Sequence, residues 1–165
     1  MSIVGLDIDP EKLKKYGLRR RAIQGHMRDA FAAMGREWHR TYLPQHFEET
    51  AYHRYGYYQR KGMGLDRNAR AYRESYAGRK FRKRGHNRPL VNTGETLALS
   101  RLLKMYVTYR GARVVLPQGL NRKHPKSRIS MRDEVTRLLP DEVRALVEVG
   151  RRAFRESVAR PPAST

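Results

Sequence analysis

The sequence predicts an α+β protein in which a long N-terminal helix and a C-terminal helix pack on a small antiparallel sheet. Three observations predict this class. Apolar residues recur every three or four positions in two long stretches, an alternating stretch lies between them, and a strongly basic stretch separates the first helix from the strands. With 165 residues, the chain is expected to form a single domain over residues 1–165.

The long N-terminal helix is predicted from about Arg20 to Leu43. Pro44 is expected to end it, because a residue that precedes proline disfavours the α conformation. The apolar stripe consists of residues at helical spacing: Ile23, Met27, Ala30, Phe31, Met34, Trp38 and Tyr42. Such a helix must lie along other elements, so Met34 and Trp38 are expected in the core.

A β-hairpin is predicted after the basic stretch. Residues 103–110 alternate between apolar and polar side chains and are rich in strand-forming types, as expected of a half-buried strand. Gly111 and Ala112 are expected to turn the chain, and Val114 begins the return strand.

The C-terminal third is expected to hold an edge strand and a helix. Residues 130–138 are interpreted as the strand, although Ser130 followed by Asp133 also resembles a helix start. Pro140 begins the second amphipathic helix. Its apolar face is expected to contain Val143, Leu146, Val147, Gly150, Phe154 and Val158.

The basic stretch is interpreted as an extended arm over residues 52–88. Residues 1–51 and 89–160 would form the body, and residues 161–165 a frayed tail. From Arg54 to Arg88, twelve Lys or Arg accompany two acids, which is half of the formal charge of +20. Like charges at this density repel one another and oppose an apolar core.

The arm is expected to contact a partner. Six tyrosines lie among its basic residues, and tyrosine offers rigid contact area with a polar end. Basic residues with aromatics are typical of proteins that bind a nucleic-acid backbone, and Tyr and Arg are also enriched where subunits meet. The predicted contact residues are Tyr55, Tyr57, Tyr58, Arg60, Lys61, Arg67, Arg70, Arg73, Arg79, Lys80, Arg82, Lys83, Arg84 and Arg88.

No enzymatic activity, cofactor or metal is expected. The histidines do not pair with carboxylates at a metal-binding spacing, and no phosphate loop or nucleophile motif is present. Residues 46–49 are interpreted as a polar exit from the helix rather than as ligands. Four acids are candidates for a two-metal nuclease site: Asp7, Asp9, Asp29 and Glu37. Helix capping and pairing on a helix surface explain these acids better.

Two further absences bear on the environment. The chain has no cysteine, which excludes disulfides and thiolate zinc sites. No apolar run approaches the roughly 20 residues that a membrane helix needs, so no membrane partner is expected.

Residues 88–97 read Arg-Pro-Leu-Val-Asn-Thr-Gly-Glu-Thr-Leu. This stretch resembles the tail-completion and virion-morphogenesis proteins of tailed phages, which carry the phrase Pro-Leu-Val-x-Thr/Ser-Gly-x-Leu after a basic, glycine-punctuated stretch. Leu97 comes one residue later than in that phrase, and the Arg or Lys usual after the glycine is missing. The resemblance covers roughly residues 38–158, and the matching turn consists of Pro89, Leu90, Val91, Thr93 and Gly94.

The resemblance implies a structural protein of the virion neck. Such head–tail joining proteins form rings, often of six subunits, that connect the portal and its adaptor to the tail around the DNA channel. The implied partners are copies of the chain itself, neighbouring neck, adaptor, portal and tail-tube proteins, and the backbone of genomic DNA. The protein would reside at the top of the tail in the virion, and in the host cytoplasm during assembly.

The residues alone leave an alternative open, a monomeric nucleic-acid-binding protein of ribosomal or nucleoid type without sequence preference. A small nuclease is a third interpretation, for which no metal or nucleophile constellation is found.

Overall fold

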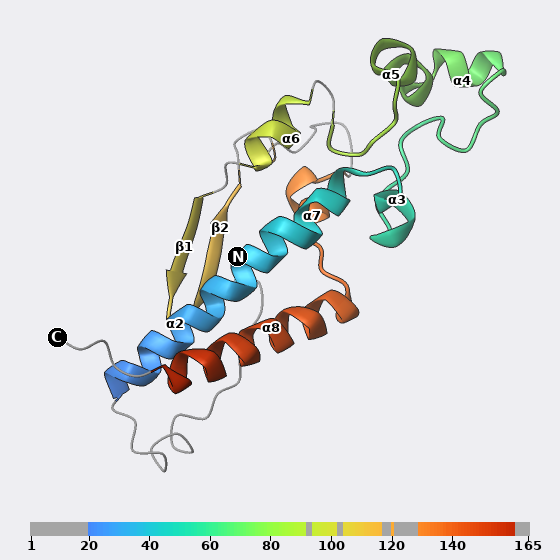
Figure 1. The fold of residues 1–165 in the computed structure, drawn as a ribbon. Coiled ribbons are helices and arrows are strands. Elements are labelled where there is room, and N and C mark those ends of the chain that lie inside the picture. Colours follow the sequence, from blue (N-terminus) through green and yellow to red (C-terminus); the bar gives the residue numbers. More distant parts are fainter. Residues whose placement is uncertain (1–19, 92–93, 102–103, 117–119, 121–128, 161–165) are drawn as a thin grey trace. The chain divides into compact units, whose positions relative to one another are not determined.

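A computed structural model of the chain describes residues 20–91, 94–101, 104–116, 120 and 129–160 (Figure 1). The helices and the one antiparallel strand pair among these residues confirm the α+β class. Where chain length predicts a single domain, the contacts cluster into two compact units, which are described separately. The first unit is drawn from Met1–Tyr42, Lys104–Val115 and Leu138–Thr165, and the second from Leu43–Leu103 and Leu116–Arg137.

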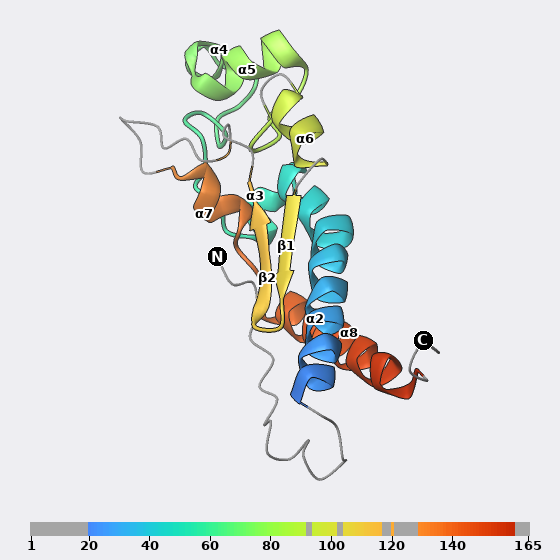
Figure 2. The same ribbon diagram turned by 90° about the vertical axis from the view of Figure 1, so that its left-hand side faces the viewer.

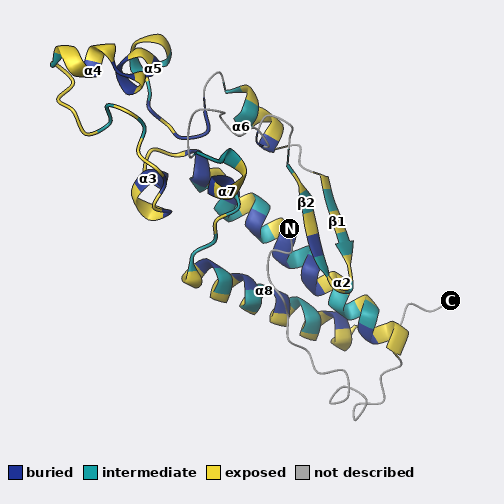
Figure 3. Ribbon diagram, turned by 180° about the vertical axis from the view of Figure 1, so that it is seen from behind, coloured by how far each residue is buried: buried dark blue, intermediate teal, exposed yellow. Residues whose placement is uncertain are grey.

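Helix α2 (Arg20–Glu37) is the central element of the first unit. It lies between the β-hairpin and α8 (Pro140–Ala159), and contacts both (Figures 1 and 3). Gly35 lets the hairpin come close, because a Cβ there would lie 2.2 Å from the sulfur of Met105. The predicted stripe is confirmed by the buried residues Ile23, Ala30, Phe31, Met34 and Trp38.

The regular α-helix ends at Glu37, earlier than the predicted end at Leu43. Trp38–Tyr42 form a π-helix, η1, and Leu43–Phe47 a 3-10 helix, η2, which begins the second unit. Pro44 lies inside η2. In an α-helix, proline lacks the N–H for the bond to the carbonyl four residues earlier, and its ring clashes with that carbonyl. Pro44 therefore interrupts the α-helical pattern, although helical turns continue through Phe47.

The hairpin pairs β1 (Lys104–Thr108) with β2 (Gly111–Val115) in antiparallel register (Figure 2). Side chains alternate along β1 between exposed and half-buried, as predicted. The turn consists of residues 109–110, so the prediction of a turn at residues 111–112 was wrong. The hydroxyl of Thr108 accepts the N–H of Arg110 at 3.2 Å. This bond closes the turn immediately before β2.

Helix α8 begins at Pro140 as predicted, and its first turn is closed by the carboxylate of Glu142, which accepts the N–H of Leu139 at 3.1 Å. Leu146 is fully buried on the face toward α2. Val158, predicted on that face, is exposed. Ser157 takes the buried position instead, because its hydroxyl is hydrogen-bonded to α2.

The second unit consists of short helices. The predicted edge strand over residues 130–138 was wrong, since residues 131–135 form a helix. The hydroxyl of Ser130 accepts the N–H of Asp133 at 3.3 Å, so the capping signal prevailed over a weak alternation. The helices after η2 are α3 (Ala51–Arg54), α4 (Arg70–Glu74), α5 (Tyr76–Arg84), α6 (Glu95–Ser100) and α7 (Met131–Val135).

The prediction of an extended arm over residues 52–88 was also wrong. Most of α3 and all of α4 and α5 lie in this stretch, and their inner faces are buried (Figure 3). Tyrosine, alanine and glycine between the basic residues face inward, while most charged ends remain in water. The stretch therefore supplies part of the core of the second unit, including Tyr52, Tyr55, Tyr57, Tyr72 and Ala77.

Candidate polyanion-binding surface

Two of the three tyrosines predicted to touch a partner are internal. Tyr55 stacks on His46 with ring centroids 4.0 Å apart. The hydroxyl of Tyr57 donates to the backbone oxygen of Glu134 at 2.7 Å and also contacts His46 Nδ1. Both tyrosines are buried, so their assignment as contact residues is corrected, whereas Tyr58 is 62% exposed and remains available.

The hydrogen bonds of Tyr57 determine the tautomer of His46. The single hydroxyl proton of Tyr57 is donated to Glu134, so the same hydroxyl must accept a proton from His46 Nδ1. Burial, with Arg54 nearby, lowers the pKa of His46 to about 4. The predicted polar helix exit at residues 46–49 was wrong for His46 and Phe47, which are core residues.

Arg60 is also an internal residue. Its guanidinium donates two hydrogen bonds to the carboxylate of Glu134, at 2.8 and 2.7 Å, and lies 5.5 Å from the ring centre of Tyr52. Both charged side chains are about nine-tenths buried. Arg60 therefore joins two distant parts of the second unit and is not available to a partner.

Lys80 is the second basic residue that the structure removes from the predicted surface. Its ammonium donates to the backbone oxygen of Arg88, and the residue is buried. Burial, reinforced by the positive charge of Arg60, lowers the pKa of Lys80 to about 8. Arg84 is half-buried. Arg88 is exposed, although its backbone carbonyl accepts the hydrogen bond from Lys80.

Helices α4 and α5 form a helical hairpin, called here the α4–α5 hairpin, with Ser75 between them. The hydroxyl of Ser75 donates to the carbonyl of Tyr72 at 2.6 Å and accepts the N–H of Gly78 at 3.1 Å, which caps α5. Gly78 is needed for the close approach, because a Cβ there would lie 2.0 Å from the oxygen of Tyr72. The N–H of Ala77 also donates to the carbonyl of Lys61 at 3.1 Å.

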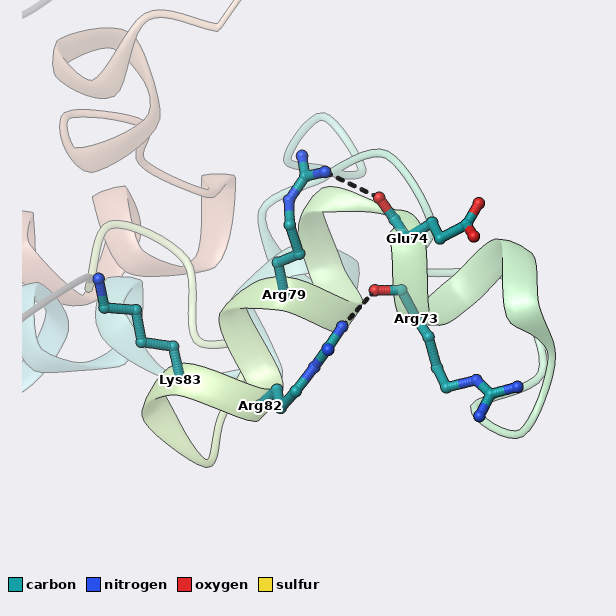
Figure 4. Close-up of a pocket in the computed structure, with 5 residues that line it drawn as sticks. All are labelled: Arg73, Glu74, Arg79, Arg82 and Lys83. Carbon is teal, nitrogen blue, oxygen red and sulfur yellow. Dashed lines mark hydrogen bonds between the residues drawn. The ribbon is translucent and has the colours of Figure 1, made fainter.

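The outer side of this hairpin carries what we call the basic face, formed by Arg73, Arg79, Arg82 and Lys83. With Glu74 these residues line an open hollow of about 580 Å³ (Figure 4). Arg79 donates to the carbonyl of Glu74 at 2.9 Å, and Arg82 donates to the carbonyl of Arg73 at 2.7 Å. Two guanidinium groups are thus held in place by the backbone of α4.

Among the described residues that line the hollow, Glu74 alone is acidic. It pairs with Arg70 at 2.7 Å on the exposed side of α4. Among the described residues, the ion pairs leave the basic face without a carboxylate partner. Nearby, Arg67 packs 4.8 Å from the ring centre of Phe81, and Lys61 is exposed.

The turn that resembles the phage proteins leads away from the hairpin. Pro89, Leu90 and Val91 are buried, and Leu90 has a left-handed backbone with φ of 58°. Thr93 lies outside the described residues. Gly94 has φ of 86° and precedes α6, which agrees with its expected role as a turn glycine.

In the first unit, hydrogen bonds join Asp29, Ser157 and His26, the residue types of a hydrolase triad. The hydroxyl of Ser157 donates to Asp29 at 2.6 Å, so it accepts the proton of His26 Nδ1 at 2.9 Å. A hydrolase triad needs the histidine between the serine and the acid, where it can take the serine proton. Here the serine lies in the middle, and the three residues join α2 to α8.

The functional residues that sequence reasoning missed are those that support the basic face. Ser75 and Gly78 set the geometry of the α4–α5 hairpin, and Asn87 fastens its inner side by donating to the hydroxyl of Tyr72 at 3.1 Å. A serine three residues before a glycine is a weak capping signal that was available in the sequence. The partner of Asn87 was not, because the contact depends on the fold.

In the part of the chain that the structure describes, no group of His, Asp or Glu is arranged to hold a metal ion. None of the helices in those ranges combines the length and the apolar character needed to span a bilayer. Comparison with protein-family models, curated proteins and solved structures finds no match for this chain.

Proposed function

We propose that this chain is a non-enzymatic structural protein of a tailed-phage neck that assembles into a ring between the portal with its adaptor and the tail. The placement in the neck rests on the resemblance of residues 88–97 to tail-completion proteins. The observation that carries a contact role is the basic face, which a folded hairpin presents without a carboxylate partner among the described residues. A polyanion or an acidic protein surface would complete it.

Ring formation requires two different surfaces on each subunit that meet head to tail. Exposed apolar groups are the usual anchors of such contacts. In the first unit, Tyr106 is 59% and Val115 42% exposed on the outward side of the β-hairpin. In the second unit, Leu65 and Tyr76 are exposed, and Tyr76 lies on α5, which carries part of the basic face. These residues offer contact area that a neighbouring copy would cover.

The experiment that tests the proposal is the mass of the purified, nuclease-treated protein, measured by light scattering at low and high salt. A ring held by apolar contacts is expected as one discrete multimer that persists at high salt, either alone or after a neck partner is added. A mixture of sizes that collapses to monomer at high salt would instead indicate association through residual nucleic acid.

A strict monomer under all these conditions would overturn the ring and favour the alternative, a monomeric nucleic-acid-binding protein. One observation favours that alternative: the basic face is complete within a single chain and needs no second subunit to form. Its mark would be a monomer whose mass increases only when DNA or RNA is returned.

A further inference from the structure

We infer that the basic face of the α4–α5 hairpin binds the phosphate backbone of double-stranded DNA without reading base sequence. The inference deepens the proposed function and rests on it for its biological setting. The predicted arm had no defined partner. The inference assigns one to a defined surface on two short helices, and the four cations of this surface are Arg73, Arg79, Arg82 and Lys83.

The first argument is that two guanidinium groups are fixed before a ligand arrives. Arg79 and Arg82 each donate to a carbonyl at the end of α4, at 2.9 and 2.7 Å. A guanidinium has five N–H donors, so each group retains donors for a phosphate after this bond. Fixing a long side chain in advance reduces the entropy that binding would otherwise cost.

The second argument concerns charge. Glu74 contributes the one carboxylate among the described residues of the hollow, and Arg70 binds it at 2.7 Å. Figure 4 shows that this carboxylate is directed away from Arg82 and Lys83. The basic face therefore presents a concentrated positive potential at the surface, where an anion with several phosphates in a row gains most.

The third argument selects duplex DNA over single strands. Binders of single strands stack successive bases on a series of aromatic side chains. Four of the six tyrosines of the basic stretch are buried, which leaves Tyr58 and Tyr76 exposed. Tyr76 shares α5 with the basic face, and the other aromatic ring of that helix, Phe81, is half-buried and already covered by Arg67. Cations without a stacking platform match a duplex, whose phosphates face outward and whose bases are already stacked.

An acidic protein surface fits the same residues less well. Stable protein interfaces have an apolar, well-packed centre with a polar rim. The described residues that line the hollow are four cations and one acid, with no apolar side chain among them. Such a surface suits a partner that offers charge at regular spacing, which a phosphodiester backbone does.

The test is the binding of the full chain to a short fluorescent duplex of mixed sequence, followed by anisotropy over a range of salt concentrations. If all four cations neutralise phosphates, affinity should fall on the order of a hundredfold between about 50 and about 200 mM salt. Lys83→Gln is the cleanest variant, since the described contacts give its ammonium no structural bond. It should lower the magnitude of the logarithmic salt slope by about 1.

Stronger variants need a control for charge and for folding. The triple variant Arg79→Gln, Arg82→Gln, Lys83→Gln should lower the slope by about 3, with helicity by circular dichroism unchanged. A matched triple on the exposed side of α8, Arg144→Gln, Arg151→Gln and Arg155→Gln, removes the same charge. It should leave the slope near that of the original protein.

Several results would overturn the inference. Equal losses from both triples would show that DNA responds to net charge and not to this face. Tighter binding of a single strand than of a duplex, abolished by Tyr76→Ser, would assign the face to unstacked bases. A ring that forms normally but ignores DNA would refute the inference and leave the proposed function intact, whereas duplex binding by a strict monomer would do the reverse.

Discussion

At the scale of single residues, the structure separates basic side chains that look alike in the sequence. Arg60 and Lys80 are internal, whereas Arg79 and Arg82 lie at the surface. Charge density predicted a contact surface that included all four residues of the basic face, and the structure places these four at the surface. Charge density did not identify Arg60 and Lys80 as internal residues. The burial of Arg60, for example, depends on Glu134, 74 positions away.

The hydroxyl of Tyr57 joins His46 Nδ1 to the carbonyl of Glu134 inside the second unit. Tyr57→Phe should lower the free energy of unfolding by about 1–3 kcal/mol, because it removes the acceptor of the buried His46 Nδ1–H and one of the two bonds to the carbonyl of Glu134, which also accepts the N–H of Arg137. Urea denaturation measures this loss. Tyr58→Phe is the matched control, since Tyr58 is 62% exposed, and its effect should stay within about 0.5 kcal/mol. Equal effects would show that the internal bond contributes nothing.

The buried imidazole of His46 should also make stability depend on pH. Its pKa in the folded state is lowered to about 4, below the ordinary value of 6.5. The unfolded chain then binds a proton at a pH where the folded chain does not, so stability should fall as pH drops from about 6.5 toward 4, by about 3 kcal/mol in all.

Measurement of this dependence compares urea unfolding at several pH values with the same series for His46→Gln. The substitution should lower stability near neutral pH and remove most of the loss between pH 6.5 and about 5, where carboxylates still carry their charge. If His46→Gln and the original protein show the same pH profile, folding does not lower the pKa of His46.

At the scale of elements, length and periodicity decided what the sequence could reveal. Helices α2 and α8 show an apolar face over several turns, and both were predicted. The helices of the basic stretch have four to nine residues, too few for a period to emerge. Their positions depend instead on single residues such as Ser75 and Gly78. The hairpin was predicted with its turn displaced, because Thr108 rather than Gly111 closes the turn.

Gly78 holds the two helices of the α4–α5 hairpin close together. Gly78→Ala should lower the free energy of unfolding by about 1–3 kcal/mol, because the new methyl group meets backbone that cannot rotate away. Gly25→Ala is the matched control, a helical glycine with no atom within 4 Å of the added carbon. It should raise stability by about 0.5–1 kcal/mol, since alanine is the better helix former. Both values come from urea midpoints, and a stabilising Gly78→Ala would refute the close approach.

At the scale of the whole molecule, the formal charge of +20 is what the sequence conveys most directly. Composition suggested that charge and core exclude each other, which led to the prediction of an extended arm. The structure shows that they coexist, since tyrosine and small residues alternate with cations whose ends reach water. Which side chains of such a stretch are buried depends on tertiary contacts, such as the hydrogen bond between Asn87 and Tyr72. Composition carries no information on these contacts.

A chain with this charge should be destabilised by its own repulsion at low ionic strength. Sodium chloride screens exposed charges and leaves the buried pair of Arg60 and Glu134 almost unaffected. The urea midpoint should therefore rise as salt increases from about 10 to about 150 mM, a range over which the screening length shortens to about 8 Å. The triple replacement of arginines on α8 lowers the charge and should flatten this rise. A midpoint that falls with salt would show that surface ion pairs outweigh the repulsion, in which case the exposed cations would be stabilising the folded chain rather than remaining available to an anionic partner.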